Sequence, residues 1–120
     1  MKSGDEGLSQ ESSEALKKAI DLDPYSPLIL REFVRTLKSQ GKYQESEDTC
    51  KQAIDLNPEA TWPWIELAIL TGSQGKHAET ESAYRSVINI DPAHPMAWSG
   101  LSIALAFQEK YLESENAIKK

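Results

Sequence analysis

The sequence has little of what disulfide-stabilised, thiolate-metal or membrane-spanning proteins require. Its 120 residues include one cysteine, Cys50, which excludes an internal disulfide and a multi-thiolate metal site. No apolar run is longer than a few residues, and the opening string MKSGDEGLSQ contains no apolar core of the secretory kind. We therefore predict a cytoplasmic protein with no membrane partner.

Excess positive charge is also lacking. Lys and Arg number 13 against 19 Asp and Glu, which gives a formal net charge of −6. Sequence-independent binding to nucleic acid needs a basic face, so no nucleic-acid partner is expected. The remaining composition, 39% hydrophobic and 27% charged residues, is ordinary for a globular domain.

What the sequence does have is a period. The strings AIDLDP, AIDLNP and VINIDP end at Pro24, Pro58 and Pro92, so these three string ends are spaced 34 residues apart. Nearly identical strings at a fixed spacing are typical of proteins built from stacked structural repeats.

Within each period the apolar residues follow helical spacing rather than strand alternation. One stripe consists of Ile29, Leu30, Phe33, Val34 and Leu37, and the next of Trp64, Leu67, Ala68 and Thr71. The string SQGK, at 39–42 and 73–76, then places a glycine where a helix can end in a left-handed residue. A second helical pattern follows each time, so each period is predicted to be a helical hairpin. We expect seven helices, no strands, and turns near Gly41, Pro58, Gly75 and Pro92.

These residues resemble the tetratricopeptide repeat family, whose period is 34 residues and whose pattern is W-x2-L-G-x2-Y, A-x3-F and P. The first aromatic position corresponds to Leu30, Trp64 and Trp98, and the small position of the second helix to Ser46, Thr80 and Ser114. The last copy departs from the pattern at Glu109, where the others have Gly41 and Gly75. The resemblance covers practically the whole chain. It implies an all-α fold, an α-solenoid of stacked antiparallel helical hairpins in a right-handed superhelix.

In this phase the chain is a single array that is partial at both ends. The expected units are 1–24, mainly the second helix of a repeat over 8–22; two repeats at 27–60 and 61–94; and a repeat at 95–120 truncated near its end. Apolar residues near the ends, Leu8, Leu16 and Ile118, would then lack neighbours, because each hairpin of such an array buries its apolar face against the next. The chain is therefore predicted to be a fragment of a longer array or to associate through its exposed ends as a homo-oligomer.

The resemblance implies that the first helices line a concave groove. The groove residues that it assigns are Leu28, Arg31, Arg35 and Lys38, then Trp62, Ile65 and Ile69, then Met96, Ile103 and Phe107. The three basic residues share one helix face and form either a solvated surface or a strip that pairs with acidic side chains. The apolar residues are either covered by further repeats or sister chains, or they receive apolar anchors of a peptide.

Some members of this family hold the C-terminal carboxylate of chaperone tails with lysine, arginine and asparagine side chains in the groove. Here the asparagine positions hold Arg35 and Glu66, and a lysine position in the last repeat holds Met96. A chaperone-tail clamp is therefore not expected.

Catalytic chemistry has no support in the sequence. His77 aligns with Tyr43 and Tyr111 and is expected to pack between hairpins, while His94 lies in a proline-flanked turn, and neither has a nucleophile beside it. Cys50 belongs to an apolar stripe and is expected to be buried. We predict no catalytic residue, no metal ion and no cofactor.

Two functions fit these observations. The first is a non-catalytic protein–protein interaction module that binds a peptide with acidic and apolar residues in its groove. The alternative is a structural or regulatory segment of a larger enzyme or assembly, acting through self-association or end-to-end stacking.

Overall fold

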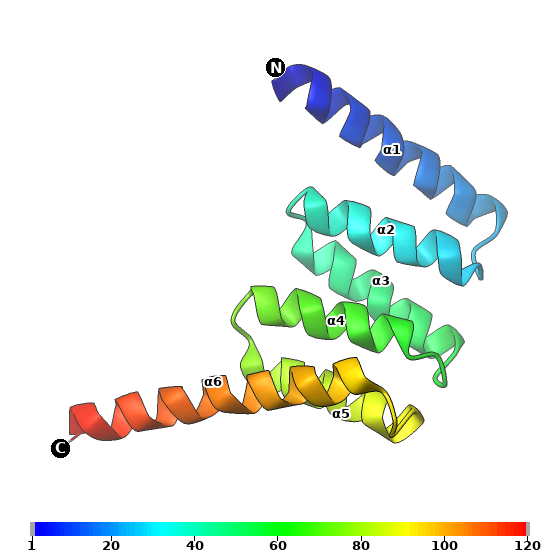
Figure 1. The fold of residues 1–120 in the computed structure, drawn as a ribbon. Helices are drawn as coiled ribbons and strands as arrows, with labels where there is room; N and C mark the ends of the chain where they lie inside the picture. The colour runs from blue at the N-terminus through cyan, green and yellow to red at the C-terminus, as the bar shows by residue number, and fades with distance from the viewer. Residues whose placement is uncertain (1, 120) are drawn as a thin grey trace. The chain divides into compact units, whose positions relative to one another are not determined.

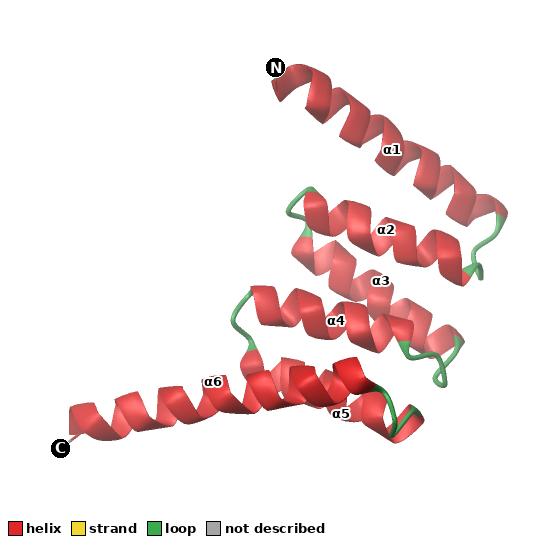
Figure 2. Cartoon of the chain, in the orientation of Figure 1, coloured by secondary structure: helices red, strands yellow, loops and turns green. Residues whose placement is uncertain are grey.

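The computed structural model describes the backbone of residues 2–119 and the side chains of residues 10–110. Over that backbone the chain has six α-helices and no strand, joined by short turns (Figures 1 and 2). The helices are α1 (Lys2–Leu22), α2 (Pro27–Ser39), α3 (Tyr43–Leu56), α4 (Trp62–Ser73), α5 (His77–Ile90) and α6 (Pro95–Lys119). They divide between two compact units, Met1–Pro63 and Trp64–Lys120.

The prediction of a seventh helix was wrong, because α6 continues through Glu109 to Lys119 without a turn. A hairpin turn at this point needs a residue with positive φ, and a glutamate is strained there whereas it favours a helix. The start of α1 was also misplaced: this helix begins at Lys2 and passes through Gly7 instead of beginning at residue 8. The side chains of Leu8 and Ile118, which the end prediction named, lie outside the described residues.

The two glycine turns are confirmed. Gly41 and Gly75 have φ of 77° and 76°, and the amide of the following lysine reaches back into the preceding helix. Lys42 N–H donates to the Leu37 carbonyl and Lys76 N–H to the Thr71 carbonyl, each at 2.9 Å. These bonds satisfy carbonyls that the end of a helix would otherwise leave unpaired.

Proline turns join the hairpins, as predicted, and α2 and α6, which follow two of them, start on capping side chains. The Ser26 hydroxyl accepts a hydrogen bond from Ile29 N–H at 3.4 Å, ahead of Pro27 in the first turn of α2. At the start of α6 the same role falls to His94, whose Nδ1 accepts from Ala97 N–H at 3.3 Å. The imidazole therefore acts as a helix cap.

Within the hairpins, the two helices approach closely at a small hydroxyl side chain. Ser46 of α3 is fully buried and its Oγ donates to the Val34 carbonyl of α2 at 2.9 Å. One period later Thr80 of α5 donates to the Ala68 carbonyl of α4 at 3.5 Å. Cys50 is buried in the first hairpin, as predicted for a small apolar residue.

In the second unit the core joins all three helices. It consists of Ala68, Ala83, Tyr84, Val87, Ala97 and Leu101, with Trp64, Ile65 and Ile88 packed around it. The Tyr84 ring lies so close to the backbone of Gly100 that a Cβ atom on this residue would overlap the ring. Gly100 thus sets how closely α5 and α6 pack.

We expect Gly100→Ala to destabilise the chain and Gly72→Ala to have the opposite effect. Both glycines are helical, so alanine should gain roughly 0.5–1 kcal/mol of helix propensity at each position. At Gly72 the new methyl would lie 3.5 Å from Thr80 Oγ1, an ordinary contact. At Gly100 it would displace a buried ring, which costs about 1–3 kcal/mol. Urea unfolding of the two variants measures this, and equal midpoints would contradict the packing.

Candidate functional site

The second unit contains a small cavity, partly open to solvent, that is lined by residues of α4, α5 and α6. Its volume is about 210 Å³, and it brings together three of the predicted groove residues, Ile69, Ile103 and Phe107. The rest of the lining consists of Ala68, Gly72, His77, Thr80, Tyr84, Gly100 and Ala104. The lining is mostly apolar and includes two glycines, of which Gly100 lies against the Tyr84 ring.

An aromatic pair forms one wall of this cavity. The rings of His77, the first residue of α5, and Phe107, on α6, are stacked with their centroids 4.5 Å apart and their planes 3° from parallel. Lys110 Nζ lies 5.9 Å from the Phe107 ring centroid, within the range of a cation–π contact. His77 is therefore a packing residue, as predicted, and it packs at the cavity rather than in the core.

Neutral polar groups line the inner side. The Thr80 hydroxyl lines the cavity and lies 2.8 Å from the buried Thr71 hydroxyl behind it, so one donates to the other and the remaining proton reaches a backbone carbonyl of the hairpin. Burial raises the pKa of the Tyr84 phenol above its ordinary value of 10.0, so the group is uncharged at neutral pH. The cavity therefore offers shape and apolar surface, with no ionised group at Thr80 or Tyr84.

Beside the cavity, a charged network ties α5 to α6. Gln108 Nε2 donates to Glu81 Oε1 at 2.8 Å, and Arg85 Nε donates to Glu81 Oε2 at 2.7 Å. The bond from Gln108, then that from Arg85, holds the pKa of Glu81 below its ordinary value of 4.5. Since Gln108 follows Phe107 directly, this network fixes the helix turn that carries one wall of the cavity.

The remaining predicted groove residues occupy other places. On α2, in the first unit, Leu28, Arg31 and Arg35 are exposed and Lys38 is half-buried, and both arginines interact with other groups of the chain. Trp62 is half-buried at the start of α4, Ile65 packs against the core of the second unit, and Met96 is exposed at the start of α6.

Sequence reasoning missed the glycines and the hydroxyl and aromatic residues of the second helix that complete the cavity. Gly72 and Gly100 were the available signal, because a glycine inside a helix is unfavourable unless a close approach or a space requires it.

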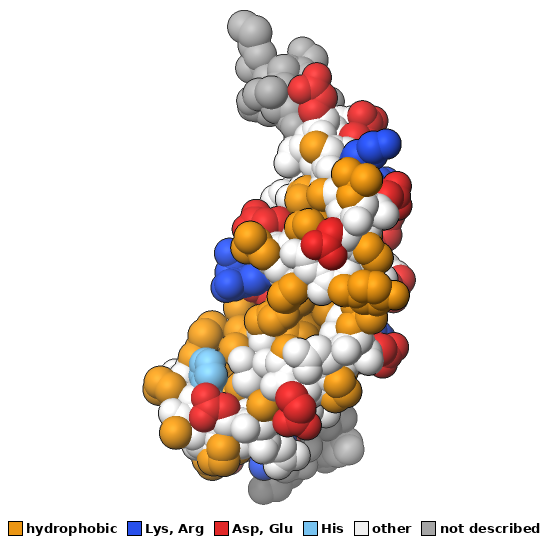
Figure 3. All heavy atoms as spheres, turned by 90° about the vertical axis from the view of Figure 1, so that its right-hand side faces the viewer, with side chains coloured by type: hydrophobic (Ala, Val, Ile, Leu, Met, Phe, Trp, Pro, Cys, Tyr) orange, Lys and Arg blue, Asp and Glu red, His pale blue; other side chains and the backbone are white. Residues whose placement is uncertain are grey.

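Large hydrophobic side chains also lie at the surface outside the cavity. One such face, where orange side chains lie beside red acidic ones, appears in Figure 3. Among the exposed large hydrophobic residues of the chain, Leu28 and Tyr25 are 68% and 72% exposed.

Two classes of site find no support in the described part of the chain. Among these residues no group of three or more His, Cys, Asp or Glu could hold a metal ion. Across the same residues, no helix combines the length and the apolar content needed to cross a bilayer.

Comparisons with known proteins agree with this architecture. A family model described as tetratricopeptide repeat matches residues 33–59. The crystal structure of MamA protein is 25% identical with a TM-score of 0.75, over 96% of this chain and 63% of that one. The first TPR domain of human RPAP3 is 25% identical with a TM-score of 0.72, over 91% and 88% of the two chains.

A third similar structure is the first TPR of Spaghetti (RPAP3) bound to the HSP90 peptide SRMEEVD. It is 22% identical with a TM-score of 0.72, over 88% of this chain and 83% of that chain. The chain thus spans less than two thirds of the MamA structure but most of the two RPAP3 domains. A comparison with curated protein sequences gave no match. The helical hairpins and these likenesses establish an all-α helical-repeat solenoid.

Acid should remove the effect of the Glu81 network on stability. The folded-state pKa of Glu81 lies below 4.5, so its contribution is complete above pH 4.5 and is lost as the pH falls through the lowered pKa. We expect Glu81→Gln to lower the melting temperature at neutral pH and to match the unmodified chain in strong acid. Thermal unfolding followed by circular dichroism across this pH range measures the difference.

Gln108→Leu removes the same hydrogen bond from the other side and serves as the matched variant. It should reproduce the loss at neutral pH. A melting-temperature difference that is independent of pH for both variants would show that the carboxylate charge has no part in holding α6.

Proposed function

Because the chain has the tetratricopeptide repeat fold and carries a matching repeat at residues 33–59, we propose that it is a non-catalytic protein–protein interaction module acting in the cytoplasm. Its ligand in this proposal is a peptide segment of a partner, bound on the first helices of the repeats. The observation that carries the proposal is the apolar cavity lined by Ile69, Ile103 and Phe107.

The size of the cavity favours a side chain over a free small molecule. Pockets for small-molecule ligands usually measure about 300–1,000 Å³, and this one measures about 210 Å³. A volume of this order suits one large apolar side chain, Leu, Ile or Phe, anchored by a peptide that lies outside. The His77–Phe107 stack supplies a flat, stiff wall for such an anchor.

Similar structures support peptide binding as a use of this fold. The first TPR of Spaghetti (RPAP3) is bound to an HSP90 peptide, and the second TPR domain of human RPAP3 is in complex with the HSP70 peptide SGPTIEEVD. In this chain the positions of the clamp residues hold Arg35, Glu66 and Met96. Glu66 is buried and already interacts within the chain, so this position offers no amide to a terminal carboxylate, and we propose an internal peptide segment as ligand.

Acidic residues of the ligand are assigned to α2. Arg31 and Arg35 are exposed one helical turn apart, and their guanidinium groups can form bidentate hydrogen bonds with carboxylates. Each arginine already interacts within the chain, so a ligand carboxylate would share or replace that interaction. This half of the proposal rests on the sequence pattern, whereas the apolar half also rests on the cavity.

We expect Ile103→Ala to weaken binding about tenfold while Leu105→Ala leaves affinity unchanged. The two residues are 56% and 37% exposed on the same helix, but only Ile103 lines the cavity. Losing a buried anchor contact costs on the order of 1–2 kcal/mol. The measurement is calorimetric titration with a peptide selected on the immobilised chain from a display library. Equal effects of the two substitutions would show that the cavity is not the binding site.

Salt should separate the charged from the apolar part of the site. We expect Arg35→Ala to reduce affinity by about 1–3 kcal/mol at low salt and by much less at high salt, since exposed ion pairs are screened. Trp62→Ala should weaken binding without this salt dependence. Lys51→Ala, an exposed residue of α3, is the control. If Lys51→Ala lowers affinity as much as Arg35→Ala does, the loss reflects the net charge of the chain, and Arg35 has no specific contact with the ligand.

A further inference from the structure

The first helix of a hairpin buries three recurrent positions, and α6 leaves the same positions open. On α2 these positions are Leu30, Val34 and Leu37, which are 2%, 1% and 0% exposed. On α6 they are Trp98, Ser102 and Leu105; Trp98 is 52% exposed, Leu105 is 37% exposed, and Ser102 is exposed as well. We call these three residues the α6 face.

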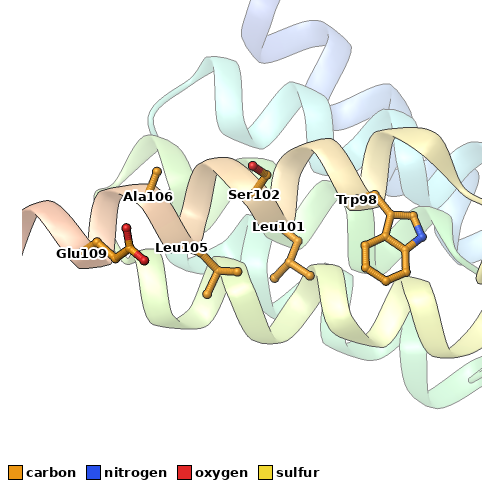
Figure 4. Close-up of a pocket in the computed structure, with 6 residues that line it drawn as sticks. All are labelled: Trp98, Leu101, Ser102, Leu105, Ala106 and Glu109. Carbon is orange, nitrogen blue, oxygen red and sulfur yellow. The ribbon is translucent and has the colours of Figure 1, made fainter.

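Figure 4 shows the surface around the α6 face, where all six labelled residues come from one helix and follow one another along it. They line an open depression of about 410 Å³, which also includes Leu101, Ala106 and Glu109. In the α2–α3 hairpin the corresponding positions are buried, and Ser46 of the second helix donates to the Val34 carbonyl among them. The repeat itself therefore indicates what fits on the α6 face: a second helix in this register.

The reverse situation exists on α1, which has the phase of a second helix. Its residues Ser12, Leu16 and Ala19, here called the α1 face, stand 34 positions before Ser46, Cys50 and Ala53. The latter three are 0%, 0% and 5% exposed. On α1, by contrast, Ser12 is exposed, and Leu16 and Ala19 are half-buried, although α1 packs against α2.

We propose that the α1 face of one copy of this chain docks on the α6 face of a second copy, completing a hairpin between two molecules. In the register of the existing hairpins, Ser12 lies opposite Ser102 and its hydroxyl donates to the Ser102 carbonyl, as Ser46 donates to Val34 and Thr80 to Ala68. In this antiparallel register Trp98 lies opposite Leu16, so two large apolar side chains are buried against each other.

The lengths of the two helices fit this pairing. The hairpin helices have 12 to 14 residues, because a glycine turn ends each first helix and begins each second one. Helices α1 and α6 have 21 and 25 residues and contain no such turn. In antiparallel contact at the proposed register they overlap along nearly all of α1. The hairpins within the chain have no overlap of this length, because their helices are shorter.

This interface joins two different faces, so one contact between two copies uses the α1 face of one molecule and the α6 face of the other. The pair still has one unused α1 face and one unused α6 face, to which further copies can add head to tail. The interface is separate from the cavity of the proposed function, because Ile103 and Phe107 belong to the cavity lining and not to the α6 face. The two proposals can therefore fail independently.

The experiment is sedimentation velocity of the 120-residue chain over a concentration series, with one variant for each face. The unmodified chain should grow in average mass with concentration, starting from its monomer mass of 13.4 kDa. Ser12→Arg and Leu105→Arg should each remain monomeric, because each blocks one face. Their equimolar mixture should form a dimer of one copy of each and nothing larger, because only one intact α6 face and one intact α1 face remain. Circular dichroism should show unchanged helix content in both.

Ser99→Arg is the control, since it adds the same charge at an exposed position of α6 that belongs neither to the cavity lining nor to the depression, and it should associate like the unmodified chain. An unmodified chain that is monomeric at every concentration would overturn the proposal. So would a mixture of the two blocked variants that stays monomeric, or loss of association in Ser99→Arg. The mixture result distinguishes two different faces from a single face that pairs with itself, in which a blocked variant cannot be rescued by another.

Discussion

The contact on which the rest of this structure depends is the close approach of two helices at a small hydroxyl side chain. Ser46 and Thr80 occupy the same position in successive hairpins, and each donates to a backbone carbonyl of the preceding helix. A larger side chain at either position would hold the helices apart, and an apolar one would leave the hydroxyl–carbonyl bond unmade. Once this approach is set, the apolar stripes of both helices are buried together.

The glycines act around that contact in two different ways. Gly41 and Gly75 adopt positive φ and allow the chain to reverse so that the second helix returns along the first. Gly100 acts through its missing side chain, since it admits the Tyr84 ring and so sets the packing of α5 on α6. The cavity lies beside these contacts: Gly72 and Gly100 belong to its lining, and Ile69, Ile103 and the His77–Phe107 stack surround it.

In a repeat array, a helix without a neighbouring helix exposes apolar positions that are buried in the hairpins that have both helices. The same three positions that are sealed in α2 are open in α6, although all belong to one sequence pattern. On α6 the turn glycine is replaced by Glu109, and the helix runs from Pro95 to Lys119 without a turn. The chain therefore has two surfaces of different origin, a cavity within its second unit and the helix faces that remain open on α1 and α6.

The sequence by itself determined the helices of the α2–α3 and α4–α5 hairpins and the turns that join them. The 34-residue spacing of Pro24, Pro58 and Pro92, the turn glycines and the cap Ser26 act within one or two helical turns, so their effects are local and could be derived from residue type and spacing. Three members of the predicted groove, Ile69, Ile103 and Phe107, were found from the repeat phase, and they do line one cavity.

Only the tertiary structure decided the rest. The Tyr84–Gly100 packing, the Glu81–Gln108 bond and the His77–Phe107 stack join residues on different helices, and their existence depends on helix separations that no local pattern specifies. The straight course of α6 is of the same kind, because a helix former at a turn position either breaks the pattern or extends the helix, and the balance is set by what packs on either side.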